Sequence, residues 1–80
     1  MKAMADQKTA LSKCIVVDPD ILGGEPVFRG TRVPVASLFE HLESDVSLDE
    51  FLENFPTVTR SAAVTVLMGA QALTLERARG

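Results

Sequence analysis

Turn-forming residues are concentrated in one part of this chain, and their distribution constrains its fold more than any other feature. Three of the five glycines and three of the four prolines fall between residues 19 and 34. Glycine and proline interrupt regular elements, because glycine has excess backbone freedom and proline lacks an N–H donor. We therefore expect short strands and turns before residue 34 and helices after it. The 80 residues form one domain, since so short a chain cannot build a second core.

Two short extended segments are predicted in the turn-rich part. The β-branched run at residues 14–17 predicts a first strand. Residues 26–28 predict a second one, with a turn at residues 23–24 between the two. Gly30 marks another tight turn, where a positive φ costs glycine little.

Three helices are predicted after this region. Apolar residues recur at helical spacing along residues 35–42, 48–55 and 62–73, which indicates one buried face on each helix. Pro34 suits a first helical position, residues 47–50 have the form of a capping box, and Thr59 is a natural N-cap. The four-residue break at residues 56–59 is the spacing of a helix-turn-helix. The fold class is therefore mainly α, with a short N-terminal β-hairpin followed by a three-helix helix-turn-helix bundle.

The domain organisation follows from these elements. Residues 1–13 are polar and mixed in charge, and we expect a flexible N-terminal segment there. Residues 14–76 form the helix-turn-helix domain, in which the last helix runs to about Leu75, and residues 77–80 form a short polar tail. The N-terminus has no apolar stretch typical of a signal peptide, and no run is long enough to span a bilayer. We expect a cytoplasmic protein that does not contact membranes.

The third helix is predicted to have two apolar faces. The broader face should pack against the other helices and consists of Ala62, Ala63, Val66, Leu67, Ala70 and Leu73. A narrower stripe lies on the far side and consists of Val64, Met68 and Leu75. We interpret this stripe as a partner or dimer surface, and the alternative is scattered surface apolar residues. A small core that only marginally offsets the entropy of folding also favours a homodimer.

No constellation of catalytic, cofactor-binding or metal-binding residues can be identified in the sequence. The chain has one cysteine and one histidine, too few for a typical zinc site. Cys14 is expected to be a small apolar residue at the start of the first strand. His41 lies on the flank of the first helix, where we expect an exposed surface histidine. We therefore expect a protein that is not an enzyme and has no small-molecule substrate.

A few basic and small polar residues are candidates for DNA contact. Arg29 and Arg32 flank the Gly30 turn, and they either contact phosphate or pair with nearby acids of the hairpin. Arg60 lies in the first turn of the third helix, where the helix dipole disfavours a cation. A cation there suits entry of a recognition helix into a groove. The other candidates on this exposed side are Thr59, Ser61 and Thr65.

The stretch from Ile15 to Ala70 resembles the family called "domain of unknown function 433". The most specific part of the resemblance is the block Gly24-Glu25-Pro26-Val27-Phe28-Arg29-Gly30-Thr31-Arg32. Its signature positions in this chain would be Gly24, Pro26, Gly30, Thr31 and Arg32. The family usually has glycine before the second helix, and Asp45 occupies that position here.

The resemblance implies a homeodomain-like or winged-helix-like helix-turn-helix, with a recognition helix that starts at Thr59. It also implies a VapB-like antitoxin that represses its own operator and binds a PIN-like ribonuclease toxin. The alternative is a dimeric interaction module that binds a protein partner without binding DNA. The formal net charge of −3 favours this alternative, because DNA-binding domains usually carry a basic excess.

Overall fold

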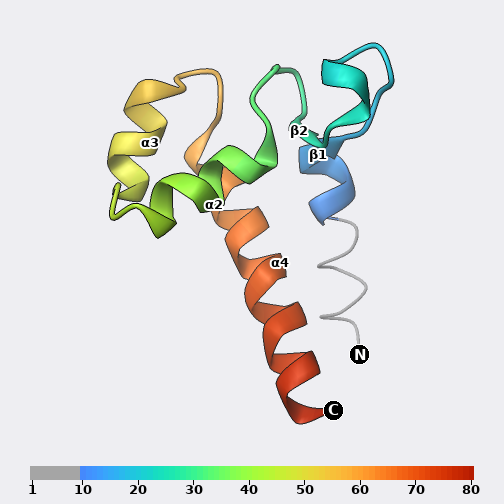
Figure 1. Cartoon of the computed structure of the whole chain (residues 1–80), viewed down its shortest axis with the longest axis vertical. Coiled ribbons are helices and arrows are strands. Elements are labelled where there is room, and N and C mark those ends of the chain that lie inside the picture. Colours follow the sequence, from blue (N-terminus) through green and yellow to red (C-terminus); the bar gives the residue numbers. More distant parts are fainter. Residues whose placement is uncertain (1–9) are drawn as a thin grey trace.

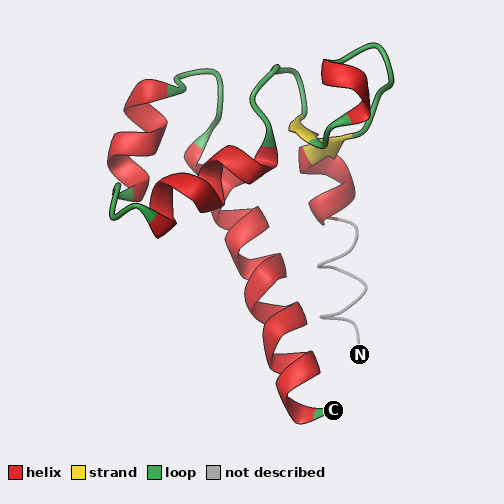
Figure 2. Cartoon of the chain, in the orientation of Figure 1, coloured by secondary structure: helices red, strands yellow, loops and turns green. Residues whose placement is uncertain are grey.

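The structure, a computed structural model, describes residues 10–80 and shows a short hairpin beside three helices (Figures 1 and 2). The sheet consists of β1 (Ile15–Val16) and β2 (Val27–Phe28), with a single 3-10 turn, η1 (Leu22–Gly24), between them. The helices are α2 (Val35–Glu43), α3 (Leu48–Asn54) and α4 (Arg60–Arg79). The mainly helical fold with a short N-terminal hairpin, predicted from the sequence, is thus confirmed.

The hairpin is shorter than predicted, because its first expected strand residue is helical. Residues 10–14 form a helical turn, and β1 begins only at Ile15, which pairs with Phe28 in antiparallel register. The Arg29 side chain stabilises this turn, since its Nε and Nη2 donate to the carbonyl oxygens of Lys13 and Ser12, both at 2.8 Å. Residues 10–13 of the expected flexible segment are thus helical in the structure, and residues 1–9 lie outside the described part of the chain.

The helices α3 and α4 begin directly after the capping residues that were predicted from the sequence. The side-chain oxygen of Ser47 accepts from the N–H of Glu50 at 3.1 Å, and that of Thr59 accepts from the N–H of Ala62 at 3.1 Å. Each bond satisfies an amide that has no partner within its own helix. Pro34 is the N-cap of α2 rather than its first residue. The turn between α3 and α4 is therefore fixed at both ends by local chemistry.

The core lies where α2, α3 and the first half of α4 meet the hairpin. Its buried members are Phe28, Leu38, Phe51, Val58, Ala63 and Val66. They come from β2, from each of the three helices and from the turn before α4. Leu11 of the helical turn also packs on this cluster, and a Cβ at Gly69 would lie 2.8 Å from Leu11 Cδ1. Glycine at position 69 thus allows the helical turn to approach α4 closely.

His41 is not the exposed histidine that we expected. Its ring packs edge-on against Phe51 of α3 and against Phe55, the C-cap of that helix, each with a centroid distance of 5.4 Å. Its Nδ1 lies 2.6 Å from the carbonyl oxygen of Ser37. The expectation failed because the flank of α2 that carries His41 is covered by α3, which the periodicity of α2 alone does not show.

The second half of α4 extends away from the body of the molecule (Figure 1). All residues from 71 to 80 are exposed, so Leu73 does not join the core as predicted and is 53% exposed. The helix also continues to Arg79 instead of ending near Leu75. Residues 75–79 contain neither glycine nor proline, and glutamate, alanine and arginine favour helix. The expected polar tail is therefore almost entirely helical.

Asp45 ends α2 in a conformation that favours glycine. Its φ is +64°, its N–H donates to the Leu42 carbonyl at 3.2 Å, and the next N–H, of Val46, donates to the His41 carbonyl at 2.9 Å. This pattern is the Schellman motif, whose left-handed position usually holds glycine. The glycine that the family resemblance implies at this position thus has a direct conformational reason.

We expect Asp45→Gly to stabilise the domain by about 1 kcal/mol, because the left-handed strain of an L-residue disappears. For a domain of this size that corresponds to a rise of about 4–8 °C in Tm. Ser44→Gly is the matched control, since Ser44 has a φ of −96° and no such strain. Thermal unfolding followed by circular dichroism should show opposite shifts, and a lower Tm for Asp45→Gly would contradict the motif.

Candidate functional site

The first turn of α4 holds three of the residues predicted to contact DNA, but two of them have structural partners. The Thr59 hydroxyl caps the helix, and the Arg60 guanidinium forms an ion pair with Asp49 of α3. Both charged side chains are exposed, at 59% and 74%, so the pair contributes only about 0–1 kcal/mol to stability. Ser61 is exposed, and Thr65 is half-buried one turn further along. The turn therefore presents a small polar surface in which the arginine is already paired.

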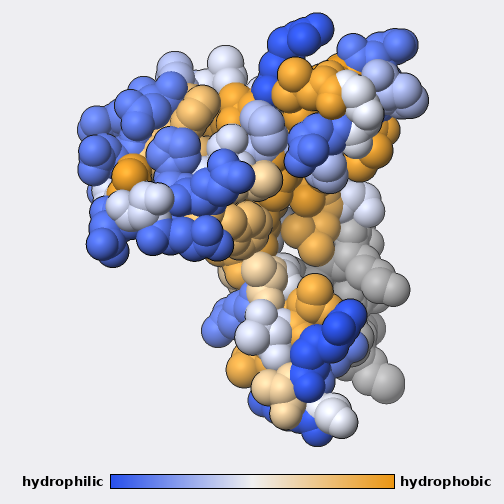
Figure 3. Space-filling view, viewed as in Figure 1, coloured by the Kyte–Doolittle hydropathy of each residue, from blue (hydrophilic) through white to orange (hydrophobic). Residues whose placement is uncertain are grey.

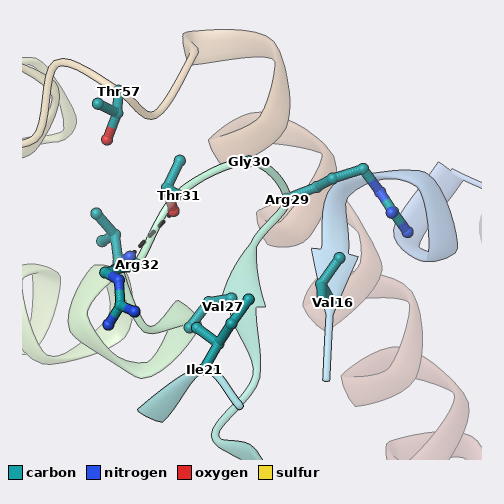
Figure 4. A pocket seen from close by; sticks show the side chains of 9 residues that line it. Val16, Ile21, Val27, Arg29, Gly30, Thr31, Arg32 and Thr57 are labelled. Carbon is teal, nitrogen blue, oxygen red and sulfur yellow. Dashed lines mark hydrogen bonds between the residues drawn. The ribbon is translucent and has the colours of Figure 1, made fainter. Parts of the chain in front are cut away.

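Arg29 and Arg32 have different environments, although they lie three residues apart. Arg29 points toward the helical turn at residues 10–14 and donates to its carbonyls, as described above (Figure 4). It therefore makes no ion pair with an acid of the hairpin, which was one of our two expectations. Arg32 is exposed and forms no hydrogen bond or ion pair within the described residues. Arg29 is therefore engaged by backbone carbonyls of the chain, whereas Arg32 is not.

The signature block forms a tightly bonded connection between β2 and α2. Gly30 has a φ of +78° in a turn closed by the N–H of Thr31 and the Phe28 carbonyl at 3.0 Å. The Thr31 hydroxyl donates to the same carbonyl at 2.8 Å and accepts from the N–H of Val33 at 3.0 Å. The Pro26 carbonyl accepts from the N–H of Val35 at 2.9 Å. The backbone of this loop is therefore held in a defined position.

Gly24 also has a positive φ, of +94°. It closes η1, and its N–H donates to the Ile21 carbonyl at 3.1 Å. The signature glycines therefore occupy conformations that other residues rarely adopt.

The predicted partner stripe on α4 is exposed along its whole length. Val64 is 37% exposed, Met68 50% and Leu75 45%. Figure 3 shows apolar atoms at the surface of the protruding part of α4, whereas the surface over α2 and α3 is largely hydrophilic. Leu73 is equally exposed but lies on a different side of the helix, about 140° from Met68 at 100° per residue. The second half of α4 thus presents apolar side chains with no partner among residues 10–80.

Sequence reasoning missed two contributors to these surfaces. Asp49 is not among the predicted site residues, and its ion pair with Arg60 connects two different helices. Thr57, in the turn between α3 and α4, lies beside the signature loop (Figure 4). Neither contact has a local sequence signal, because each joins segments whose relative position depends on the packed core.

Within residues 10–80, no three metal-ligating side chains come together in one group. The helices in this part of the chain lack the length and the apolar character of a membrane-spanning segment.

The family of the chain follows from comparison with known proteins. The model of a family described as "Protein of unknown function (DUF433)" matches residues 15–68. The chain belongs to this DUF433 family. The DUF433 match covers the hairpin, α2, α3, the turn before α4 and the first half of α4, which together contain all buried core residues. The exposed residues 71–80 lie outside the matched region.

Two relatives place the DUF433 segment in context. An uncharacterized protein of Sinorhizobium fredii, y4eO, is 40% identical over 53 residues, which are 66% of this chain but only 24% of that protein. The chain therefore spans about a quarter of this relative. A crystal structure of a DUF433 member from Anabaena variabilis superposes with a TM-score of 0.66 over 98% of this chain and 77% of that one. At 22% identity, this similarity shows that the fold is shared.

Proposed function

We propose that this chain is the antitoxin of a toxin–antitoxin pair, a homodimer that binds a PIN-like ribonuclease toxin and its own operator DNA. The observation that carries the proposal is the arrangement of α4. The first half of this helix packs in the core, and its second half extends with exposed apolar side chains. A monomer has no need of such a surface, whereas a subunit of a complex does. The toxin class comes from the family resemblance of the signature block.

The helices α3 and α4 supply the element proposed to bind DNA. They form a helix-turn-helix in which the start of α4 is exposed, as a recognition helix requires. Arg60 and Ser61 would approach base edges or phosphates from this turn. Two such helices in a dimer would read two half-sites.

A second candidate is a dimeric interaction module that binds protein without DNA, and the charge distribution favours it. Six carboxylates lie between residues 40 and 53, while no lysine or arginine lies between Arg32 and Arg60. A phosphate backbone would be repelled by this acidic surface. The ion pair with Asp49 further reduces the positive charge that Arg60 can offer.

The two candidates are separated by the DNA binding of two variants that both remove this ion pair but change the local charge in opposite directions. We expect Arg60→Ala to weaken binding to the DNA upstream of the gene by about 1–3 kcal/mol if it reaches a base edge. If Arg60 contacts only phosphate, the salt slope should fall by about one unit per half-site. Asp49→Asn should strengthen binding, because it removes a negative charge and releases Arg60.

Arg79→Ala is the matched control at the far end of the same exposed helix. It should leave binding to this DNA unchanged. If the wild-type chain shows no salt-sensitive binding to this DNA, alone or with the toxin, the operator role fails and the interaction module takes its place.

A further inference from the structure

An open hollow lies between the hairpin, the signature loop and the turn before α4 (Figure 4). Its volume is about 770 Å³, and four aliphatic residues line it: Val16, Ile21, Val27 and Val33. Val27 is buried, and the other three are half-buried. Arg29, Arg32 and Thr57 also line it. The hollow therefore combines an apolar wall with two cationic residues.

Arg32 is the arginine of the hollow that is available to a ligand. Arg29 is occupied by the carbonyls of Ser12 and Lys13, whereas Arg32 has no hydrogen-bonding partner within residues 10–80. The loop that carries it is held by the bonds of Thr31 on one side and by the bond from Val35 to Pro26 on the other. Little backbone ordering is thus needed when a ligand binds, and such preorganisation favours affinity.

The chemistry of the hollow favours a peptide over nucleic acid. Residues 10–34 contain three acids and three bases, so the surrounding surface has no net positive charge to attract a phosphate backbone. Aliphatic walls also have no counterpart in a phosphate chain. A guanidinium beside an apolar surface instead matches a carboxylate next to an apolar side chain, because arginine binds carboxylates with two parallel hydrogen bonds.

We propose that this hollow binds an extended segment of the toxin in which an acidic residue adjoins a large aliphatic one. The carboxylate pairs with Arg32, and the aliphatic side chain packs on Val16, Ile21 and Val33. The identity of the partner rests on the function proposed above, whereas the chemistry of the segment rests on the hollow alone. The site is separate from the α4 stripe, so one chain can dimerise and hold its partner at the same time.

The test uses the full chain labelled with ¹⁵N and the capped peptide acetyl-Leu-Asp-Leu-Asp-amide as probe. We expect its addition to shift the amide signals of residues 16, 30–33 and 57. The matched peptide with asparagine in place of aspartate should bind at least tenfold more weakly. Arg32→Gln should also lose at least tenfold in affinity for the acidic peptide, while Arg77→Gln, on exposed α4, should bind it as the wild type does. Unchanged amide spectra outside the loop would show that Arg32→Gln is folded.

Several results would overturn the proposal. No shifts at millimolar peptide, or equal binding of the two peptides, would exclude a carboxylate site. Shifts of the same amides by a short DNA duplex but not by peptide would assign the hollow to phosphate. Shifts produced by unlabelled wild-type chain, abolished by Arg32→Gln, would assign it to a second copy.

The toxin itself separates this proposal from the proposed function. If toxin binds wild type and Arg32→Gln equally, the hollow is not its docking site although the antitoxin function stands. If the acidic peptide binds through Arg32 but toxin does not bind at all, the proposed function fails and the site remains.

Discussion

Replacement of Phe51 by alanine is expected to lower the stability of the domain by about 3–5 kcal/mol, the usual loss for a buried phenylalanine. Phe51 is 0% exposed and contacts three other rings, with centroid distances of 6.4 Å to Phe28, 5.4 Å to His41 and 5.0 Å to Phe55. It therefore joins the hairpin, α2 and α3 in one cluster. For a domain of this size, the loss corresponds to a fall of at least about 12 °C in Tm.

Phe55→Ala is the matched control, since it removes an aromatic ring of the same cluster at a half-buried position directly after α3. It should cost clearly less than Phe51→Ala. Urea unfolding at equilibrium measures both values. If the two variants lose the same free energy, Phe51 is not the centre of the core.

The second large effect is expected at Met68, in the middle of the exposed stripe of α4. In an antiparallel or parallel pair of α4 helices, this stripe would be buried around the dimer axis. Met68→Asp would place two unpaired carboxylates there, and burial of an unpaired charge is strongly unfavourable. We expect the wild type to be a dimer of two 8.6-kDa chains at micromolar concentration and the variant to be a monomer. Light scattering coupled to size exclusion gives the mass directly.

Leu73→Asp provides the control for this experiment. Leu73 is 53% exposed, close to the 50% of Met68, and lies on the same helix but on another side. The Leu73→Asp variant should remain dimeric. Its behaviour therefore distinguishes loss of the interface from a loss of helix stability or a general effect of the added charge. A monomeric wild type, or dissociation by Leu73→Asp alone, would contradict the assignment of the stripe.

The features that could be predicted from the sequence are those determined by local chemistry. Ser47 and Thr59 cap their helices as expected, because a side-chain oxygen three residues before a free amide is a local signal. The need for a positive φ at Gly30 is equally local. These residues fix where the helices begin and turn, and the helix-turn-helix order follows from them.

The features that escaped prediction depend on contacts between segments distant in sequence. Arg29 was placed with acids or phosphate, yet it stabilises the helical turn at residues 10–14, which the charge pattern does not reveal. His41 is covered by rings from another helix. Leu73 lies on the same side of α4 as the core residues, but at a point of the helix that no other element covers. It is exposed because α4 is longer than the body against which it packs. Periodicity gives the direction of a side chain and not the extent of the surface facing it.

The antitoxin proposal requires that a PIN-like ribonuclease is encoded beside this chain. It is tested most directly by titrating the RNA cleavage of that ribonuclease with the purified chain. The proposal predicts that RNA cleavage falls to background near one chain per toxin, and that a stable complex forms at the same ratio. An unchanged cleavage rate with no complex at micromolar concentrations of both proteins would contradict it.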